Sequence, residues 1–214
     1  MDIAILLFDR FTALDAIGPY EVLSRVPGAR VTFVAAHAGP VSTDSQMLTM
    51  LAERSIAELA HPDVVLVPGG PGEVGARAGE ETLQWLRDAD ETSTWTTSVC
   101  TGSLILAAAG LLTGRRATSH WLALARLAEL GAVVVPERVV FDGKFVTAAG
   151  VSAGIDMALA LAAELAGVEV AQAIQLGIEY DPQPPFDAGA PEKAPAAITD
   201  ALRARSRFSA APAG

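Results

Sequence analysis

Short apolar runs alternate along the chain with longer stretches in which apolar residues recur at helical spacing. Some runs, such as Val64–Val67, contain no polar position, which is typical of parallel strands covered on both faces. We expect further strands at Asp2–Phe8, Arg30–Ala36, Ala117–Ser119, Val133–Val135, Val139–Phe141 and Phe145–Ala148, and one that begins at Trp95 and ends before Cys100. The alternation predicts an α/β sandwich with a mostly parallel central sheet and helices on both faces.

Proline and glycine mark the ends of the helices between these strands. Apolar spacing predicts helices at Glu80–Asp90, Leu122–Leu130, Ala153–Leu165 and Val168–Ile178, and one that follows Cys100 and ends around Gly110. Within Phe11–Val26, the Gly18-Pro19 pair places the start of the regular helix at about Pro19. We therefore expect Asp15 in the loop that leads into this helix.

Two further stretches predict turns or irregular structure. Gly39–Leu51 predicts hairpin-like extended structure, and Asp142-Gly143 predicts a hairpin turn. From about Tyr180 the chain is rich in proline, which excludes regular helix and central strand, before Pro195–Phe208 predicts a short final helix. We expect a single domain over residues 1–214 with a proline-rich arm from about 180, and Phe186 in this arm indicates docking, for example on a second subunit.

Composition and charge narrow the classes of function. The chain has no apolar run near the roughly 20 residues that span a bilayer, and Met1 leads into a strand without a basic leader, so we expect a cytoplasmic protein without a membrane partner. A formal net charge of -10 argues against nucleic acid as a partner. One cysteine and three scattered histidines lack the spacing of metal ligands, so we expect no metal.

The single cysteine, Cys100, lies at the predicted junction between a strand and a helix. The small residues Thr101, Gly102 and Ser103 permit the sharp turn that exposes a nucleophile at the edge of a sheet. The first N–H groups of the helix and its dipole would favour a thiolate there. A lone cysteine is otherwise most often a small buried apolar residue, and that alternative remains open at this point.

Other candidate site residues follow from the same topology. Asp15 comes after the first strand, at the edge where open α/β folds place their chemistry, although it could simply cap or turn the chain. The loop Pro68–Gly72 contains Gly69 and Gly70, whose backbone could line an oxyanion-type pocket or form a plain turn, and it lacks the lysine of a phosphate-binding loop. His120 is a possible secondary partner or a satisfied histidine, and Val151 is a candidate for the lining of a pocket.

Four motifs in order resemble the ThiJ/PfpI superfamily over most of the chain. They are Asp15, the PGG loop at 68–70, SVCTGS at 98–103 and TSHW at 118–121. The sequence is most similar to the isocyanide (isonitrile) hydratase branch of this superfamily, through LDAIGP at 14–19, AGLLTGRRATSHW at 109–121 and EYDPQPPFDAG at 179–189. Sensory domains of some AraC-type regulators share similar elbow and histidine-tryptophan segments.

The resemblance implies a flavodoxin-like three-layer sandwich, a homodimer, and hydration of isocyanides to N-substituted formamides without a cofactor. In that chemistry Cys100 attacks the isocyanide carbon, Asp15 shuttles a proton and Thr101 helps to position the covalent thioimidate. A carboxylate beside a thiolate raises both pKa values, so we expect Asp15 to work in its protonated form.

Two other functions use the same cysteine. One is cofactor-free glyoxalase chemistry on small 2-oxoaldehydes. The other is a non-enzymatic thiol sensor or ligand-binding module, in which the elbow N–H groups hold an oxidised Cys100. Peptidase members of the superfamily carry histidine directly after the cysteine, whereas this chain has Thr101, which argues against proteolysis.

Overall fold

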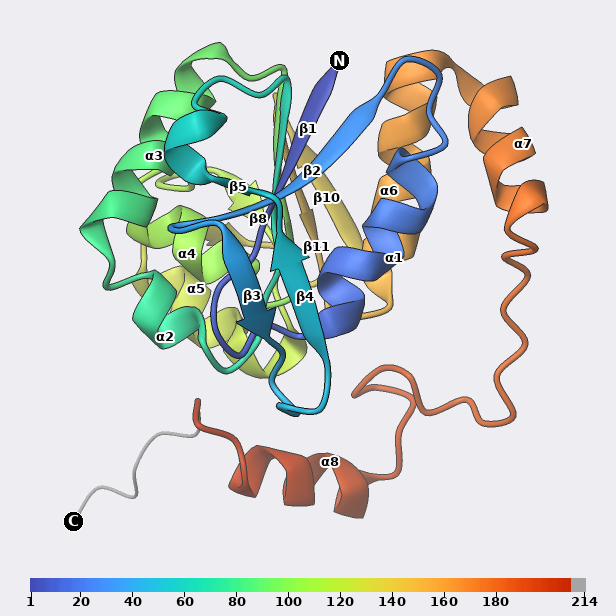
Figure 1. The fold of residues 1–214 in the computed structure, drawn as a ribbon. Helices are drawn as coiled ribbons and strands as arrows, with labels where there is room; N and C mark the ends of the chain where they lie inside the picture. Colours follow the sequence, from blue (N-terminus) through green and yellow to red (C-terminus); the bar gives the residue numbers. More distant parts are fainter. Residues whose placement is uncertain (209–214) are drawn as a thin grey trace.

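A seven-stranded sheet forms the centre of the molecule in the computed structural model, which describes residues 1–208 (Figure 1). The strands follow the order β10-β11-β7-β6-β1-β2-β5. Their bounds are β1 (Asp2–Leu6), β2 (Arg30–Ala35), β5 (Arg54–Ser55), β6 (Val64–Val67), β7 (Trp95–Val99), β10 (Val139–Asp142) and β11 (Phe145–Ala148). Only β10 and β11 pair antiparallel, so the predicted mostly parallel sheet is confirmed.

Helices cover both faces of this sheet, as the alternation predicts (Figure 1). One face carries α1 (Ala13–Leu23), α6 (Ala153–Ala166) and α7 (Val168–Gly177), and the other carries α2 (Glu73–Ala76), α3 (Glu80–Thr92), α4 (Gly102–Ala108) and α5 (Leu124–Glu129). Successive residues of β1 contribute to different cores: Ile3 and Ile5 face the first layer, while Ala4 and Leu6 face the second. The protein is a three-layer α/β sandwich.

Smaller elements lie outside the central sheet. The expected hairpin is present as β3 (Gly39–Ser42) and β4 (Thr49–Ala52), and β8 (Arg116–Ala117) pairs with β9 (Val133–Val134) in a separate two-stranded sheet. Short 3₁₀ turns lie at Ile56–Glu58 (η1) and Trp121–Ala123 (η2). No helix among residues 1–208 is long and apolar enough to span a membrane.

The start of α1 differs from the prediction. The helix begins at Ala13, so Asp15 lies in its first turn and Pro19 lies in its interior, where it cannot donate to the carbonyl of Asp15. Tertiary contacts explain the early start, because the Thr12 N–H donates to the carbonyl of Gly69 at 2.8 Å. Pro19 also packs beside Gly154 of α6, where a built Cβ would lie 3.2 Å from Pro19 Cγ. Packing here outweighs the local preference of proline.

The proline-rich arm leaves the domain after α7 and ends in α8 (Ala196–Ala204), which lies beyond the carboxyl edge of the sheet (Figure 1). Phe186 is exposed in this single chain, so the docking expected for it has no partner here among residues 1–208. Residues 205–208 return to the body of the domain, and residues 209–214 of the expected arm lie outside the described residues.

Gly102 lets α4 start directly against the end of β6. A Cβ at this position would lie 2.1 Å from the carbonyl oxygen of Val67, a backbone atom that cannot rotate away. We expect Gly102→Ala to lower the free energy of unfolding by about 3 kcal/mol, as over-packing of a dense core does. Urea denaturation followed by circular dichroism measures this change. Gly177→Ala is the matched control, because a Cβ there meets nothing within 4 Å. Equal stability of the two variants would contradict the argument.

Candidate active site

Cys100 occupies a sharp turn between β7 and α4. Its φ is 57°, a left-handed conformation that is rare for residues other than glycine and costs about 1–3 kcal/mol. The surrounding backbone fixes this conformation, because the Cys100 N–H donates to the carbonyls of Ala148 at 3.1 Å and Ala149 at 2.9 Å. Its own carbonyl accepts hydrogen bonds from the hydroxyls of Ser103 at 3.2 Å and Ser119 at 3.0 Å. The predicted elbow is therefore present and held from both sides.

Asp15 is fully buried beside the thiol. Its Oδ2 atom accepts a hydrogen bond from the Gly69 N–H at 2.8 Å, while Oδ1 has no well-aligned hydrogen bond to any residue in 1–208. Burial raises the pKa of Asp15 to about 7, and the Gly69 N–H and the Cys100 thiol oppose this rise. The carboxyl can therefore hold or release a proton near neutral pH.

The surroundings of Cys100 favour its protonated form. Burial, followed by the charge of Asp15, raises its pKa to about 12. Hydrogen bonds from the backbone N–H groups of Val151 and Thr101 lower it, so the start of the helix acts in the expected direction. The two larger effects outweigh these hydrogen bonds, so the net shift of the pKa favours the thiol, opposite in direction to the expected stabilisation of a thiolate. The pair titrates as a unit, since protonation of Asp15 removes the charge that opposes ionisation of Cys100.

The glycine loop after β6 has a different role from the one expected. The Gly69 N–H binds Asp15, and the Gly70 N–H donates to Thr101 Oγ1 at 3.0 Å. Both N–H groups are thus occupied and do not form an oxyanion pocket. A Cβ on Gly69 would lie 2.5 Å from the Thr101 nitrogen and 3.0 Å from Asp15 Oδ2, so only glycine permits this approach. The N–H groups that face the sulfur belong to Thr101 and Val151.

A cavity of about 380 Å³ opens above the thiol. Cys100, Thr101, His120 and Val151 line it, together with the C-terminal segment 205–208. Asp15 does not reach the cavity directly, so it lies behind the sulfur. A larger cavity of about 640 Å³ lies at the ends of β1 and β2, but it contains neither member of the acidic pair. The smaller cavity is therefore the candidate active site.

His120 lines the cavity without a hydrogen bond to Cys100. Its Nδ1 accepts the N–H of Leu122 at 3.3 Å, so the neutral ring carries its proton on Nε2. Burial, and then the charge of Arg207, lowers its pKa. Gly150 makes room for the ring, because a Cβ there would lie 2.9 Å from His120 Cδ2. His120 is a neutral N–H donor at the wall of the cavity.

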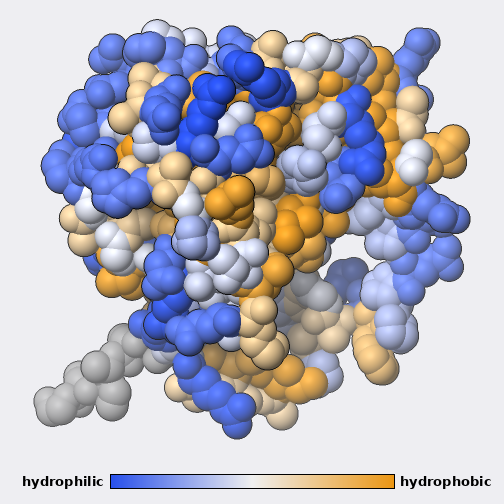
Figure 2. Space-filling view, viewed as in Figure 1, coloured by the Kyte–Doolittle hydropathy of each residue, from blue (hydrophilic) through white to orange (hydrophobic). Residues whose placement is uncertain are grey.

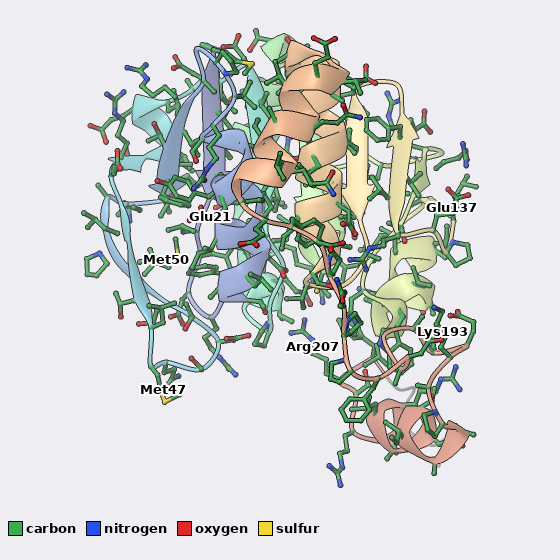
Figure 3. The ribbon with its side chains drawn as sticks, turned by 90° about the vertical axis from the view of Figure 1, so that its right-hand side faces the viewer. Glu21, Met47, Met50, Glu137, Lys193 and Arg207 are labelled. Atoms are coloured by element: carbon green, nitrogen blue, oxygen red, sulfur yellow. The ribbon has the colours of Figure 1, made fainter. Side chains whose placement is uncertain are left out.

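The segment 205–208 is the part of the site that the sequence did not reveal. Arg207 binds the glycine loop from outside, and Figure 3 shows this residue at the end of the body that faces α8. The predicted final helix carries Arg203, Arg205 and Arg207 near its end, but no sequence signal placed them beside Cys100. Among residues 1–208, no group of three or more His, Cys, Asp or Glu side chains is arranged to hold a metal ion.

Comparison with known proteins identifies the family. Residues 1–164 match the DJ-1/PfpI family. The chain belongs to the DJ-1/PfpI family. An isonitrile hydratase from Pseudomonas putida is 45% identical over 206 residues, which cover 96% of this chain and 90% of that protein. The resemblance found in the sequence motifs is confirmed.

Solved structures of the DJ-1/PfpI family show the same fold. A ThiJ/PfpI family protein from Pseudomonas syringae superposes with a TM-score of 0.92 at 39% identity, over 95% of this chain and 84% of that chain. Drosophila melanogaster DJ-1beta superposes with a TM-score of 0.77 at 25% identity, over 85% and 98% of the two chains. The flavodoxin-like sandwich is therefore confirmed for this member of the family.

The raised pKa of Asp15 predicts how stability changes with pH. Between the unfolded value of 3.8 and the folded value of about 7, the native state binds more protons, so the stability of the wild type falls as pH rises. Asparagine stays neutral throughout this window. We expect the stability of Asp15→Asn relative to the wild type to increase from pH 4 to pH 7.5, by up to about 4 kcal/mol. Urea denaturation across this range measures the difference, and a constant difference would contradict the assignment.

Proposed function

We propose that this DJ-1/PfpI protein is an isonitrile hydratase that converts isocyanides into N-substituted formamides. The observation that carries the proposal is the buried Cys100–Asp15 pair, in which the carboxyl lies against a thiol that lines a small cavity. The identity of 45% to the Pseudomonas putida isonitrile hydratase along almost the whole chain supports the same conclusion.

The pair suits the addition of a thiol to the carbon of R–N≡C. The proton of Cys100 passes to Asp15 as the sulfur attacks the terminal carbon, and Asp15 then protonates that carbon. The product is a covalent thioimidate, R–N=CH–S–Cys100. Water adds to its carbon, the C–S bond breaks, and R–NH–CHO leaves while Cys100 regains its proton. Each proton is accounted for, and the net reaction consumes one water.

The neighbouring backbone groups support each step. The Gly69 N–H holds the Asp15 carboxyl in place, so that its free oxygen remains available for the proton. The N–H groups of Thr101 and Val151 stabilise negative charge on the sulfur during attack and release. The hydroxyl of Thr101 accepts the Gly70 N–H, which positions the loop. The scheme needs only addition and proton transfer, so it uses no metal or organic cofactor.

Exposed apolar side chains on α1 and on the β3–β4 hairpin offer a surface for a second copy of the chain. This surface comprises Leu14 of α1 with Met47, Leu48 and Leu51 of the β3–β4 hairpin, and Figure 2 shows apolar residues over these elements. Met47 is 91% exposed and Leu51 is 63% exposed. Apolar side chains that gather in this way are typical of interfaces. We propose a homodimer through this surface, in the cytoplasm, where a free thiol remains reduced.

A thiol sensor is the second candidate. The N–H groups of Thr101 and Val151 could hold the oxygens of an oxidised Cys100. A raised thiol pKa opposes this function, because thiolate is the form that peroxide attacks. Mass spectrometry after mild peroxide treatment separates the two functions: an inert Cys100 in an enzyme that turns over isocyanide excludes sensing.

Substitution of the pair tests the mechanism. We expect Cys100→Ala to abolish formamide production, because no covalent intermediate can form. Asp15→Asn should lower turnover by about 100-fold, as loss of a proton-transfer group does. Formamide is measured by chromatography with an aliphatic and an aromatic isocyanide, and intact-mass analysis detects the thioimidate adduct. Circular dichroism controls for folding. Retained hydration by Cys100→Ala would overturn the covalent scheme.

Disruption of the apolar surface tests the dimer. We expect Leu51→Lys to shift the protein from dimer to monomer in sedimentation velocity, because it buries an unpaired charge at the interface. Leu176→Lys is the matched control, since Leu176 of α7 is 81% exposed but lies outside this surface. Unchanged sedimentation of Leu51→Lys, or a monomeric wild type, would contradict the proposed interface.

A further inference from the structure

Arg207 joins the C-terminal segment 205–208 to the glycine loop of the site. Its Nη1 donates to the carbonyl of Pro71 at 2.6 Å, and its Nη2 donates to the carbonyl of Gly70 at 3.1 Å. The same Nη2 lies 3.5 Å from Oε1 of Glu73, at the start of α2. The guanidinium thus contacts two backbone carbonyls and one carboxylate of the same turn. Its planar array of donors suits this arrangement.

The buried carboxylate of Glu73 stabilises Arg207 in its bound position. This carboxylate is fully buried, and Nε of Arg77 lies 2.8 Å from its other oxygen. Burial raises the pKa of Glu73, and the charges of Arg77 and Arg207 oppose this rise. A buried carboxylate is costly unless cations or hydrogen bonds compensate it. Departure of Arg207 would remove one of the two arginines that lie within ion-pair distance of Glu73 among residues 1–208.

The loop that Arg207 binds is the loop that orients the acidic pair. The Gly70 carbonyl accepts from Arg207, while the Gly70 N–H donates to Thr101 on the other side. The next N–H toward the N-terminus, that of Gly69, holds Asp15. Arg207 therefore fastens residues 205–208 to the loop that contacts both Asp15 and Thr101.

The fastened segment forms a wall of the Cys100 cavity. Residues 205–208 line the cavity together with the thiol and Val151. Phe208 is partly buried against the core on the α3–α4 side, and the Arg207 guanidinium lies 4.7 Å from the centre of its ring. Phe208 also borders a side cavity of about 250 Å³ with Leu122 and Trp121. The wall is therefore partly apolar and adjoins further space.

We propose that Arg207 latches residues 205–208 over the cavity, and that this wall limits the size of the substituent carried by an electrophile that reacts with Cys100. For isocyanides the inference rests on the proposed hydratase function. The substituent R of R–N≡C points away from the reacting carbon, so a bulky R must share the cavity with Phe208. Arg207 acts through the wall and the loop, as a positioning residue that determines specificity.

Alkylation of Cys100 tests the latch without any isocyanide. Iodoacetamide and iodoacetanilide share one reaction and differ by a phenyl ring, and intact-mass analysis gives both rates relative to a small free thiol. We expect the wild type to disfavour iodoacetanilide, and Arg207→Ala to reduce this size selectivity about tenfold, because hydrogen bonds from a charged group and an ion pair hold the wall. Arg207→Lys keeps the charge near Glu73 but lacks the two separate nitrogens with which the guanidinium binds the two carbonyls, so its selectivity should be intermediate.

Arg203→Ala is the matched control on the same arm. Arg203 pairs with Asp200 at 3.6 Å and lies over the Trp121 ring, without a hydrogen bond to the glycine loop. It should keep the wild-type selectivity. Wild-type selectivity in Arg207→Ala, or an equal change in both rates, would overturn the proposal. If Arg207→Ala does not fold by circular dichroism, the same criteria apply to Arg207→Lys.

Turnover extends the test to substrates. With methyl and cyclohexyl isocyanide, Arg207→Ala should shift the ratio of kcat/KM toward the cyclohexyl compound by about tenfold, while Arg203→Ala leaves it unchanged. An unchanged ratio in Arg207→Ala would overturn the size limit. If the wild type hydrates neither isocyanide, the proposed function fails, and the alkylation experiment still decides whether the latch exists.

Discussion

The contact between the buried side chains of Cys100 and Asp15 is the interaction on which the rest of the site depends. Two buried acids side by side cannot both ionise cheaply, so burial and their mutual charge raise the pKa of Cys100, and burial raises that of Asp15. Different backbone N–H groups stabilise the Asp15 carboxyl and the Cys100 sulfur. The Gly69 N–H serves the carboxyl, whereas the N–H groups of Thr101 and Val151 serve the sulfur. Transfer of the proton from one acid to the other therefore needs little rearrangement of the surroundings.

The parallel sheet brings the residues of the site to one edge, and glycines allow the backbone segments there to approach closely. The segments that follow β1, β6 and β7 meet at one edge of the sheet and bring Asp15, the PGG loop and the elbow together. The remaining distances are too short for a side chain. A Cβ on Gly69 would strike Thr101, and one on Gly102 would strike the carbonyl of Val67. The small residues of these motifs are thus a steric requirement of the pair.

Local sequence patterns predicted what depends on local structure. The buried strands, the elbow at Cys100 and the β3–β4 hairpin all follow from runs of a few residues. The start of α1 did not, because the contact between Thr12 and Gly69 overrides the preference of Pro19. The charge state of Cys100 also escaped prediction, since burial outweighs the helix terminus only once the fold is known. Arg207 lies 136 residues from Pro71 in the chain, and no local pattern encodes such a contact.

The candidate functions differ in whether they need Cys100 to be ionised before it reacts. A peroxide sensor needs a standing thiolate, because the rate of its reaction follows the ionised fraction. Hydration of an isocyanide needs a nucleophile and also a proton for the same carbon, and the pair holds both in one place. Transfer to Asp15 generates the thiolate as the electrophile reacts. The acid beside the sulfur then supplies the proton that hydration places on the same carbon, so the pair suits the proposed hydratase chemistry.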